Sequence, residues 1–202
     1  MTPAPANWIL ASNNAGKFAE IQTLLKDIGL TVRPQSDFGV PPAAETATTF
    51  VENAVHKARH AASLTNLPSI ADDSGLAVDA LNGAPGIHSA RFAGPGCSDG
   101  DNIERLLASL DEVPEDRRSA RFYCVLVAML SPDDPAPMIA QGEWSGTIAL
   151  EPTGSGGFGY DPVFFDPDLG ATAAELPLEL KNSVSHRYRA LQYLKRMLVN
   201  QS

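Results

Sequence analysis

The sequence predicts an α/β protein with a mixed β-sheet. Short apolar runs alternate along the chain with segments whose apolar residues recur at helical spacing. Two longer apolar runs, 118–130 and 138–150, flank the turn-forming segment 131–135 and are typical of a β-hairpin. A hairpin within a chain of alternating strands and helices favours a mixed sheet rather than an all-parallel one.

The first half of the chain predicts strand, helix, strand, helix and strand in that order. Residues 8–11 form an apolar run that ends in the polar turn 12–14, and residues 30–34 and 68–71 are further short strands. A helix after the first strand carries apolar residues at Phe18, Ile21, Leu24, Leu25 and Ile28. Thr49 and Glu52 have the spacing of a capping box, so a second helix is expected to begin there.

The second half adds loops and two helices around the hairpin. Residues 83–96 are rich in Gly, Pro and Ala and predict an ordered loop, and residues 154–159 predict a flexible one. A helix follows the first loop, with Ile103, Leu106, Leu107 and Leu110 on one side. The last helix is expected to begin near Ser185.

Composition restricts the classes of function. The chain has 202 residues, 44% of them hydrophobic, and a net charge of −9 from 15 basic and 24 acidic residues. This length buries one substantial core, and without repeats or linkers it predicts one domain over residues 1–202, with residues 1–7 as a flexible extension. The acidic balance argues against a nucleic-acid partner but not against a small phosphorylated ligand.

Cysteine content and hydropathy indicate the compartment. Cys97 and Cys124 are too few for a disulfide scaffold or a structural zinc site. We expect neither a membrane-spanning segment nor a signal peptide, because no apolar run is long enough and the start lacks a charged region. A cytoplasmic protein is therefore predicted.

The segment 12–17 is a candidate phosphate site. It lies between a predicted strand and helix, where unpaired backbone N–H groups attract anions, and Lys17 adds a positive charge. Gly16 allows a close approach of the backbone to a phosphate. The alternative is an asparagine helix cap beside a solvated lysine.

The acidic residues are candidate metal ligands and bases. They comprise Glu20, Glu45, Glu52, Asp72 and Asp73. Mg²⁺ is commonly held by one or two carboxylates together with substrate phosphates. Adjacent aspartates after an extended strand are expected to point to opposite sides, one to the reaction site and one to supporting hydrogen bonds. The alternative is that Asp72 to Gly75 form a simple turn.

A third candidate combines the loop 154–161 with Lys181 and the segment 185–187. Phe158 and Tyr160 flank a glycine, where their rings could stack on a base while cationic groups donate to its keto groups. The alternative is that the aromatic residues are core anchors and that 185–187 is merely the start of a helix.

Six segments in this order resemble the inosine triphosphate pyrophosphatase family, whose members hydrolyse nonstandard purine nucleoside triphosphates. They are LASNNAGK at 10–17, FVENAVHK at 50–57, IADDSG at 70–75, GAPGIHSARF at 83–92, GGFGYD at 156–161 and SHR at 185–187. The resemblance runs from Trp8 to the last helix. Ser12 and Asn13 stand where many relatives have Thr-Gly, and Tyr160 stands where some have Trp.

The resemblance implies Mg²⁺-dependent cleavage of ITP, dITP and XTP to the monophosphate and pyrophosphate. It also implies an elongated mixed sheet flanked by helices, two lobes with an active-site cleft between them, and a homodimer. Asp73 is the implied proton acceptor, and Glu45 and Asp73 are the implied metal ligands. The implied substrate-binding residues are Ser12, Asn13, Asn14, Ala15, Gly16, Lys17, Ser74, Phe158, Gly159, Tyr160, Asp161, Lys181, His186 and Arg187.

Two alternatives stay open at the level of sequence. One is a related nucleotide pyrophosphatase of the septum-inhibitor type, acting on pyrimidine or modified nucleotides, although its first loop normally carries Ser-Pro-Arg. The other is a nucleotide-binding module without catalysis, which the presence of both Glu45 and Asp73 disfavours.

Overall fold

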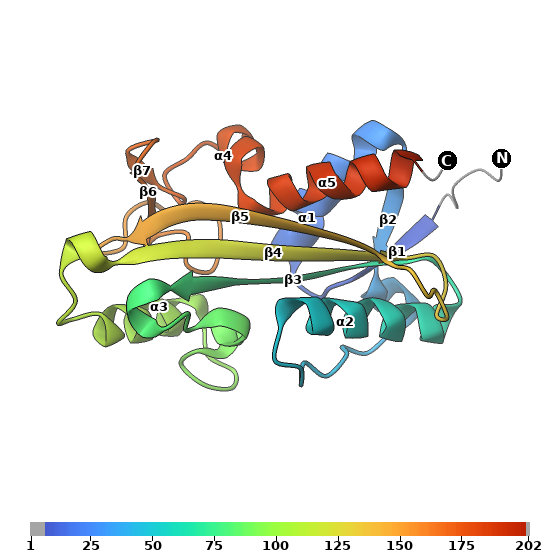
Figure 1. Cartoon of the computed structure of the whole chain (residues 1–202), viewed down its shortest axis with the longest axis horizontal. Helices are drawn as coiled ribbons and strands as arrows, with labels where there is room; N and C mark the ends of the chain where they lie inside the picture. Colours follow the sequence, from blue (N-terminus) through green and yellow to red (C-terminus); the bar gives the residue numbers. More distant parts are fainter. Residues whose placement is uncertain (1–6, 201–202) are drawn as a thin grey trace. The chain divides into compact units, whose positions relative to one another are not determined.

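The computed structural model describes residues 7–200 (Figure 1). Its strands are β1 Asn7–Ala11, β2 Thr31–Pro34, β3 Ser69–Val78, β4 Ser119–Met129, β5 Met138–Ile148, β6 Phe164–Asp166 and β7 Ala171–Thr172. Its α-helices are α1 Ala15–Leu25, α2 Phe50–Thr65, α3 Asp99–Ser109, α4 Leu178–Val184 and α5 His186–Asn200. Short 3₁₀ helices connect several of these elements.

The strands form one seven-stranded mixed sheet in the order β2-β1-β3-β4-β5-β6-β7. Strand β1 pairs in parallel with β2 and with β3, whereas β6 is antiparallel to both β5 and β7. Strands β4 and β5 are neighbours, as the predicted hairpin requires. The predicted class, an α/β protein with a mixed sheet flanked by helices, is confirmed.

Two compact units divide the chain. Unit 1 comprises Met1–Asp73, Cys124–Gly142 and Arg187–Ser202, and unit 2 comprises Ser74–Tyr123 and Glu143–His186. The chain passes between the units within β3, β4 and β5 and at the start of α5. The cleft between two lobes, and the single domain over the whole chain, stay predictions.

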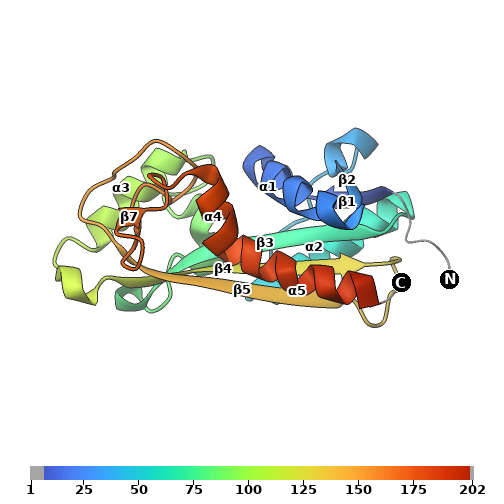
Figure 2. The same ribbon diagram turned by 90° about the horizontal axis from the view of Figure 1, so that it is seen from above.

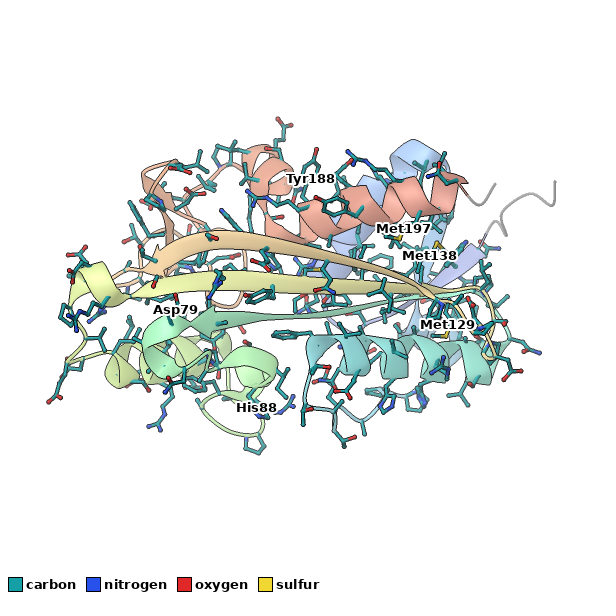
Figure 3. All side chains as sticks on the ribbon, in the orientation of Figure 1. Asp79, His88, Met129, Met138, Tyr188 and Met197 are labelled. Atoms are coloured by element: carbon teal, nitrogen blue, oxygen red, sulfur yellow. The ribbon has the colours of Figure 1, made fainter. Side chains whose placement is uncertain are left out.

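Unit 1 has three layers. Helices α1 and α5 lie on one face of its strands and α2 on the other (Figures 1 and 2). Buried residues of α1 and α5 pack with one set of strand side chains, and the buried alanines of α2, Ala54, Ala58 and Ala61, pack with the alternate set. Figure 3 shows this division at three methionines, with Met138 and Met197 on the α5 side and Met129 on the α2 side.

Unit 2 has an aromatic core. Phe122, Trp144 and Phe164 contact one another with ring centroids 4.5–6.3 Å apart, and Leu106 of α3 and its C-cap residue Leu110 belong to the same buried cluster. Trp144 Nε1 donates to Asp166 Oδ2 at 2.7 Å, so the buried indole N–H is satisfied. The same buried cluster contains Tyr160, one of the third group of predicted site residues.

Polar caps start the helices where the sequence predicts them. Thr49 is the N-cap of α2, and its Oγ1 accepts from the backbone N of Glu52 at 3.2 Å. Asn14 is the N-cap of α1, and its Oδ1 accepts from Lys17 N at 2.9 Å. Ser98 and Asp101 form a complete capping box at the start of α3.

Several features differ from the sequence-based expectation. Strand β3 continues to Val78, so Asp72 and Asp73 lie inside the strand and not in a turn after it. The short elements β6, β7 and α4 were not predicted, because their three, two and seven residues are too few to show a clear period. The predicted flexible extension lies outside the described residues except for Asn7, which begins β1. Within the described part of the chain, no helix combines the length and the apolar character needed to cross a membrane.

Candidate functional site

Strand β3 directs two adjacent carboxylates to opposite faces of the sheet. Asp72 pairs with Lys17 of α1, and Asp73 pairs with Lys57 of α2. Helices α1 and α2 cover opposite faces of unit 1 (Figure 1). The alternation expected for neighbouring aspartates in an extended strand is therefore confirmed.

Asp72 is fully buried and collects donors from three elements. Its Oδ1 pairs with Lys17 Nζ, while its Oδ2 accepts from Arg187 Nε at 3.1 Å and from Cys124 Sγ at 3.2 Å. Arg187 also pairs through Nη1 with Glu20 of α1. This network ties α1, β3, β4 and α5 together within unit 1.

The charges around Asp72 decide its protonation. Burial alone raises the pKa of this carboxyl, but Lys17 and Arg187 outweigh burial and hold the pKa well below its usual range. Asp72 is therefore ionised at neutral pH, where it fixes the ammonium of Lys17 and the guanidinium of Arg187. The contact of Arg187 with a base or sugar stays a prediction.

Asp73 belongs to a second cluster, formed with α2 and the segment before it. Lys57 Nζ donates to Asp73 Oδ1 at 2.6 Å and to Glu45 Oε1 at 3.0 Å. Asn53 Nδ2 lies 3.4 Å from Asp73 Oδ2, and Asn53 Oδ1 accepts from Ala47 N at 3.1 Å. Helix α2 thus holds both predicted metal ligands, Glu45 and Asp73, around one ammonium group.

Asp73 differs from Asp72 in its titration. Burial raises the pKa of Asp73 although Lys57 and Lys17 act in the opposite direction. The carboxylates Asp73 and Glu45 in turn raise the pKa of Lys57 against the effect of its own burial. A carboxylate with a raised pKa is a stronger proton acceptor, which suits the role predicted for Asp73.

The segment 12–17 follows β1 and leads into α1. Ser12 Oγ accepts from Asn14 N at 3.2 Å, and Asn13 Oδ1 accepts from Gln35 Nε2 at 2.7 Å. Lys17 extends to Asp72, so both its helix cap and its side chain are held in place. The alternative reading is confirmed in part, because Asn14 is a helix cap, but Lys17 is partly buried and paired with Asp72 and is not solvated. The phosphate site stays a prediction.

Unit 2 holds the third group of predicted residues. Asp161 Oδ2 accepts from Phe158 N at 2.8 Å and from Lys181 Nζ at 2.5 Å. Lys181 Nζ also lies 5.1 Å from the centroid of the Phe158 ring. Gly157 has φ +73°, and a Cβ there would meet Asp161 Oδ2 at 1.9 Å, so only glycine fits.

The structure corrects the role expected for Tyr160. Its ring is only 4% exposed and lies in the core of unit 2, where its hydroxyl donates to Ser89 O at 2.8 Å. Such a ring is a core anchor and is not free to stack on a base, whereas Phe158 is half-buried. His186 is buried and stacks on Phe122 with centroids 4.8 Å apart.

The donor set is suited to a divalent ion that brings further ligands. Within residues 7–200, no three His, Cys, Asp or Glu side chains gather closely enough to hold a metal by themselves. However, Glu45 and Asp73 converge on one positive group, the Nζ of Lys57. Two carboxylates directed at one cation fit Mg²⁺, which usually completes its shell with water and substrate phosphates.

Sequence reasoning missed Lys57, Asn53 and the pairing role of Asp72. Lys57 and Asn53 are four residues apart on α2 and so share one helix face, and both lie in the segment 50–57 already singled out. That spacing could have indicated a polar face. The contact of Asp72 with Arg187 joins residues 115 positions apart, for which the sequence carries no local signal.

The fold and the site together define an α/β protein with carboxylate–lysine pairs on both faces of one strand of its sheet. A model of the Ham1 family matches residues 8–197. The chain therefore belongs to the Ham1 family, which confirms the resemblance found in the sequence.

Individual relatives agree with this assignment. The "dITP/XTP pyrophosphatase" of Shigella flexneri is 55% identical over 192 residues, which cover 95% of this chain and 98% of that protein. The structure of a HAM1 protein from Coxiella burnetii is 49% identical, has a TM-score of 0.90, and matches 96% of this chain and 98% of its own. A nucleoside-triphosphatase / dITP/XTP pyrophosphatase from Mycobacterium abscessus is 42% identical with a TM-score of 0.75, covering 93% and 98% of the two chains.

Proposed function

We propose that this protein hydrolyses dITP, XTP and ITP to the nucleoside monophosphate and pyrophosphate. The observation that carries the proposal is the convergence of Asp73 and Glu45 on Lys57, next to the carboxylate that holds Lys17. Hydrolysis of a triphosphate mainly requires positioning and neutralisation of charge, and these residues supply both. The names of the relatives indicate the same substrates.

Unit 1 would bind the triphosphate and activate water. The ammonium of Lys17 has three N–H donors, so its pairing with Asp72 leaves capacity for a phosphate oxygen. The backbone N–H groups of Asn13 and Gly16, beside the start of α1, would add further donors, whereas those of Asn14 and Lys17 already donate within the segment. Asp73 would accept a proton from water as the water oxygen attacks phosphorus, and the anhydride bond between the α- and β-phosphates would break.

Glu45 and Asp73 would hold Mg²⁺, which when bound neutralises charge on the phosphate oxygens. The remaining steps belong to the protein. Lys57, held between the same two carboxylates, keeps them directed at one point and can donate to a phosphate. Because Lys57 lowers the pKa of Asp73 against the effect of burial, it also favours the ionised form that accepts the proton.

Unit 2 would recognise the base. Phe158 offers a half-buried ring for stacking, and Lys181 is fixed beside that ring by Asp161. Donors that meet a purine 6-oxygen pair poorly with the amino group of adenine, which disfavours ATP. His186 is proposed as a further donor for the base or sugar.

A product analysis tests the function. The purified protein is incubated with Mg²⁺ and ITP, dITP, XTP, ATP, GTP or UTP, and the products are separated by chromatography. Monophosphate and pyrophosphate from the first three substrates support the proposal. Release of orthophosphate, or equal rates with ATP, contradicts it. Activity on UTP alone would indicate the septum-inhibitor type, and binding without turnover would indicate a binding module.

Removal of the divalent ion is expected to weaken triphosphate binding by more than about tenfold, because each charge pair near the protein surface is worth on the order of 1 kcal/mol or more. The chain carries a net charge of −9, and Asp73 and Glu45 would face an anionic substrate without a metal. Isothermal titration with a non-hydrolysable ITP analogue, in Mg²⁺ and then in excess EDTA, measures the change. Undiminished affinity in EDTA would remove Mg²⁺ from the proposal.

We also propose a homodimer located in the cytoplasm, where the nucleotide pool lies. The resemblance to the inosine triphosphate pyrophosphatase family implies the dimer, and a two-fold dimer is the commonest closed assembly of identical chains. Sedimentation equilibrium at two protein concentrations tests the dimer, and a monomeric mass at both would exclude it.

A further inference from the structure

The loop that ends in Asp161 is held by contacts from several elements of unit 2. Asp161 accepts from Phe158 N and Lys181 Nζ, and Tyr160 donates to Ser89 O. These contacts hold the loop at Phe158, Tyr160 and Asp161. Gly159 lies between these anchors and has φ +61°. Its backbone N–H donates to a side chain outside the loop.

The partner of that N–H is Asp99, the first residue of α3. Asp99 Oδ2 accepts from Gly159 N at 2.7 Å, across 60 positions of sequence. The second acidic residue of the same helical turn has another role, because Asp101 accepts from Ser98 N and Ser98 Oγ in the capping box. One carboxylate therefore caps the helix, and the other reaches the loop.

We propose that Asp99 is a positioning residue for base recognition, which rests on the proposed function of unit 2. By accepting the Gly159 N–H, it holds the loop in the conformation that presents Phe158 before substrate arrives. A loop that is already ordered loses less conformational entropy when the substrate binds. Greater mobility of this loop is therefore expected to weaken substrate binding. Proton transfer depends on the groups around Asp73, so kcat is expected to change little.

Three variants test the proposal. Asp99→Ala removes the acceptor and is expected to raise KM for ITP about five- to tenfold, the scale of one lost hydrogen bond, with kcat within twofold. Asp99→Asn retains an acceptor oxygen and is expected to restore most of the wild-type KM. Asp101→Ala is the matched control, since loss of the capping box should lower Tm and leave KM unchanged.

Hydrogen exchange of peptides covering residues 155–161 gives a readout independent of turnover. Faster exchange in Asp99→Ala, but not in Asp101→Ala, is expected. Wild-type exchange in Asp99→Ala overturns the proposal, as does an unchanged KM despite faster exchange. An equal rise of KM in Asp101→Ala also overturns it, because helix stability would then be the cause. If the wild-type protein does not hydrolyse ITP, the proposed function fails, and the exchange data alone decide whether Asp99 orders the loop.

Discussion

Replacing Asp73 with asparagine is expected to lower kcat for ITP by more than about a hundredfold, the scale on which a general base contributes. The asparagine side chain keeps the size of aspartate and can accept from Lys57, but it cannot take a proton from water. It also removes one of the two carboxylates that converge on Lys57. Pyrophosphate release at saturating ITP measures the effect.

The Asp73→Asn protein is expected to remain folded. Burial raises the pKa of Asp73 in the folded protein, so at neutral pH its ionisation lowers the free energy of unfolding, and removing the charge is not expected to destabilise the fold. A Tm within a few degrees of wild type would separate loss of chemistry from loss of structure. Glu52→Gln is the matched control, because Glu52 is exposed at the start of α2, where its carboxylate accepts from the hydroxyls of Thr48 and Thr49. Wild-type kcat in Asp73→Asn would remove Asp73 from the mechanism.

The neighbouring change, Asp72→Asn, is expected to act mainly on stability, lowering the free energy of unfolding by about 3 kcal/mol. Asp72 is buried between Lys17 and Arg187, so its neutralisation leaves buried positive charge without full compensation. Urea denaturation at pH 7 measures the difference from wild type. Activity should also fall, because Lys17 loses the carboxylate that fixes it.

The pH dependence of this difference is a separate check. The pKa of Asp72 is lower in the folded protein than its usual value, so its stabilising effect is complete above the usual aspartate value of about 3.9. The effect is lost as the pH falls from there through the folded-state value. Wild type and Asp72→Asn should therefore converge in stability on acidification. A difference that stays constant from pH 7 to pH 3 would contradict the charge pairing as its cause.

Local periodicity was sufficient to predict much of the fold. The strand–turn–helix at the start, the Thr49 cap of α2 and the paired strands β4 and β5 depend on residues close in sequence. The length of β3 was predicted wrongly, because Asp72 to Gly75 are turn-forming residues. They remain in a strand because cations from α1, α2 and α5 compensate the carboxylates after folding.

The two aromatic residues of the glycine loop also show that local sequence does not predict which side chains become buried. Phe158 and Tyr160 flank Gly159 alike in the sequence, and both were assigned to the base. In the structure Tyr160 lies in the core and Phe158 does not. Nothing local distinguishes them, since the burial of Tyr160 depends on Ser89, 71 positions away.

Ordered motifs and hydrophobic periods are properties of the chain, so the amino-acid sequence was enough to predict the family, the fold class and the types of residue available for chemistry. Which carboxylate meets which cation, in contrast, depends on the folded structure. Asp72 and Asp73 are chemically identical neighbours, yet alternation in β3 gives one to Lys17 and Arg187 and the other to Lys57. Their partners lie 16 to 115 positions away, so burial and pairing set two different pKa values that the sequence alone does not contain.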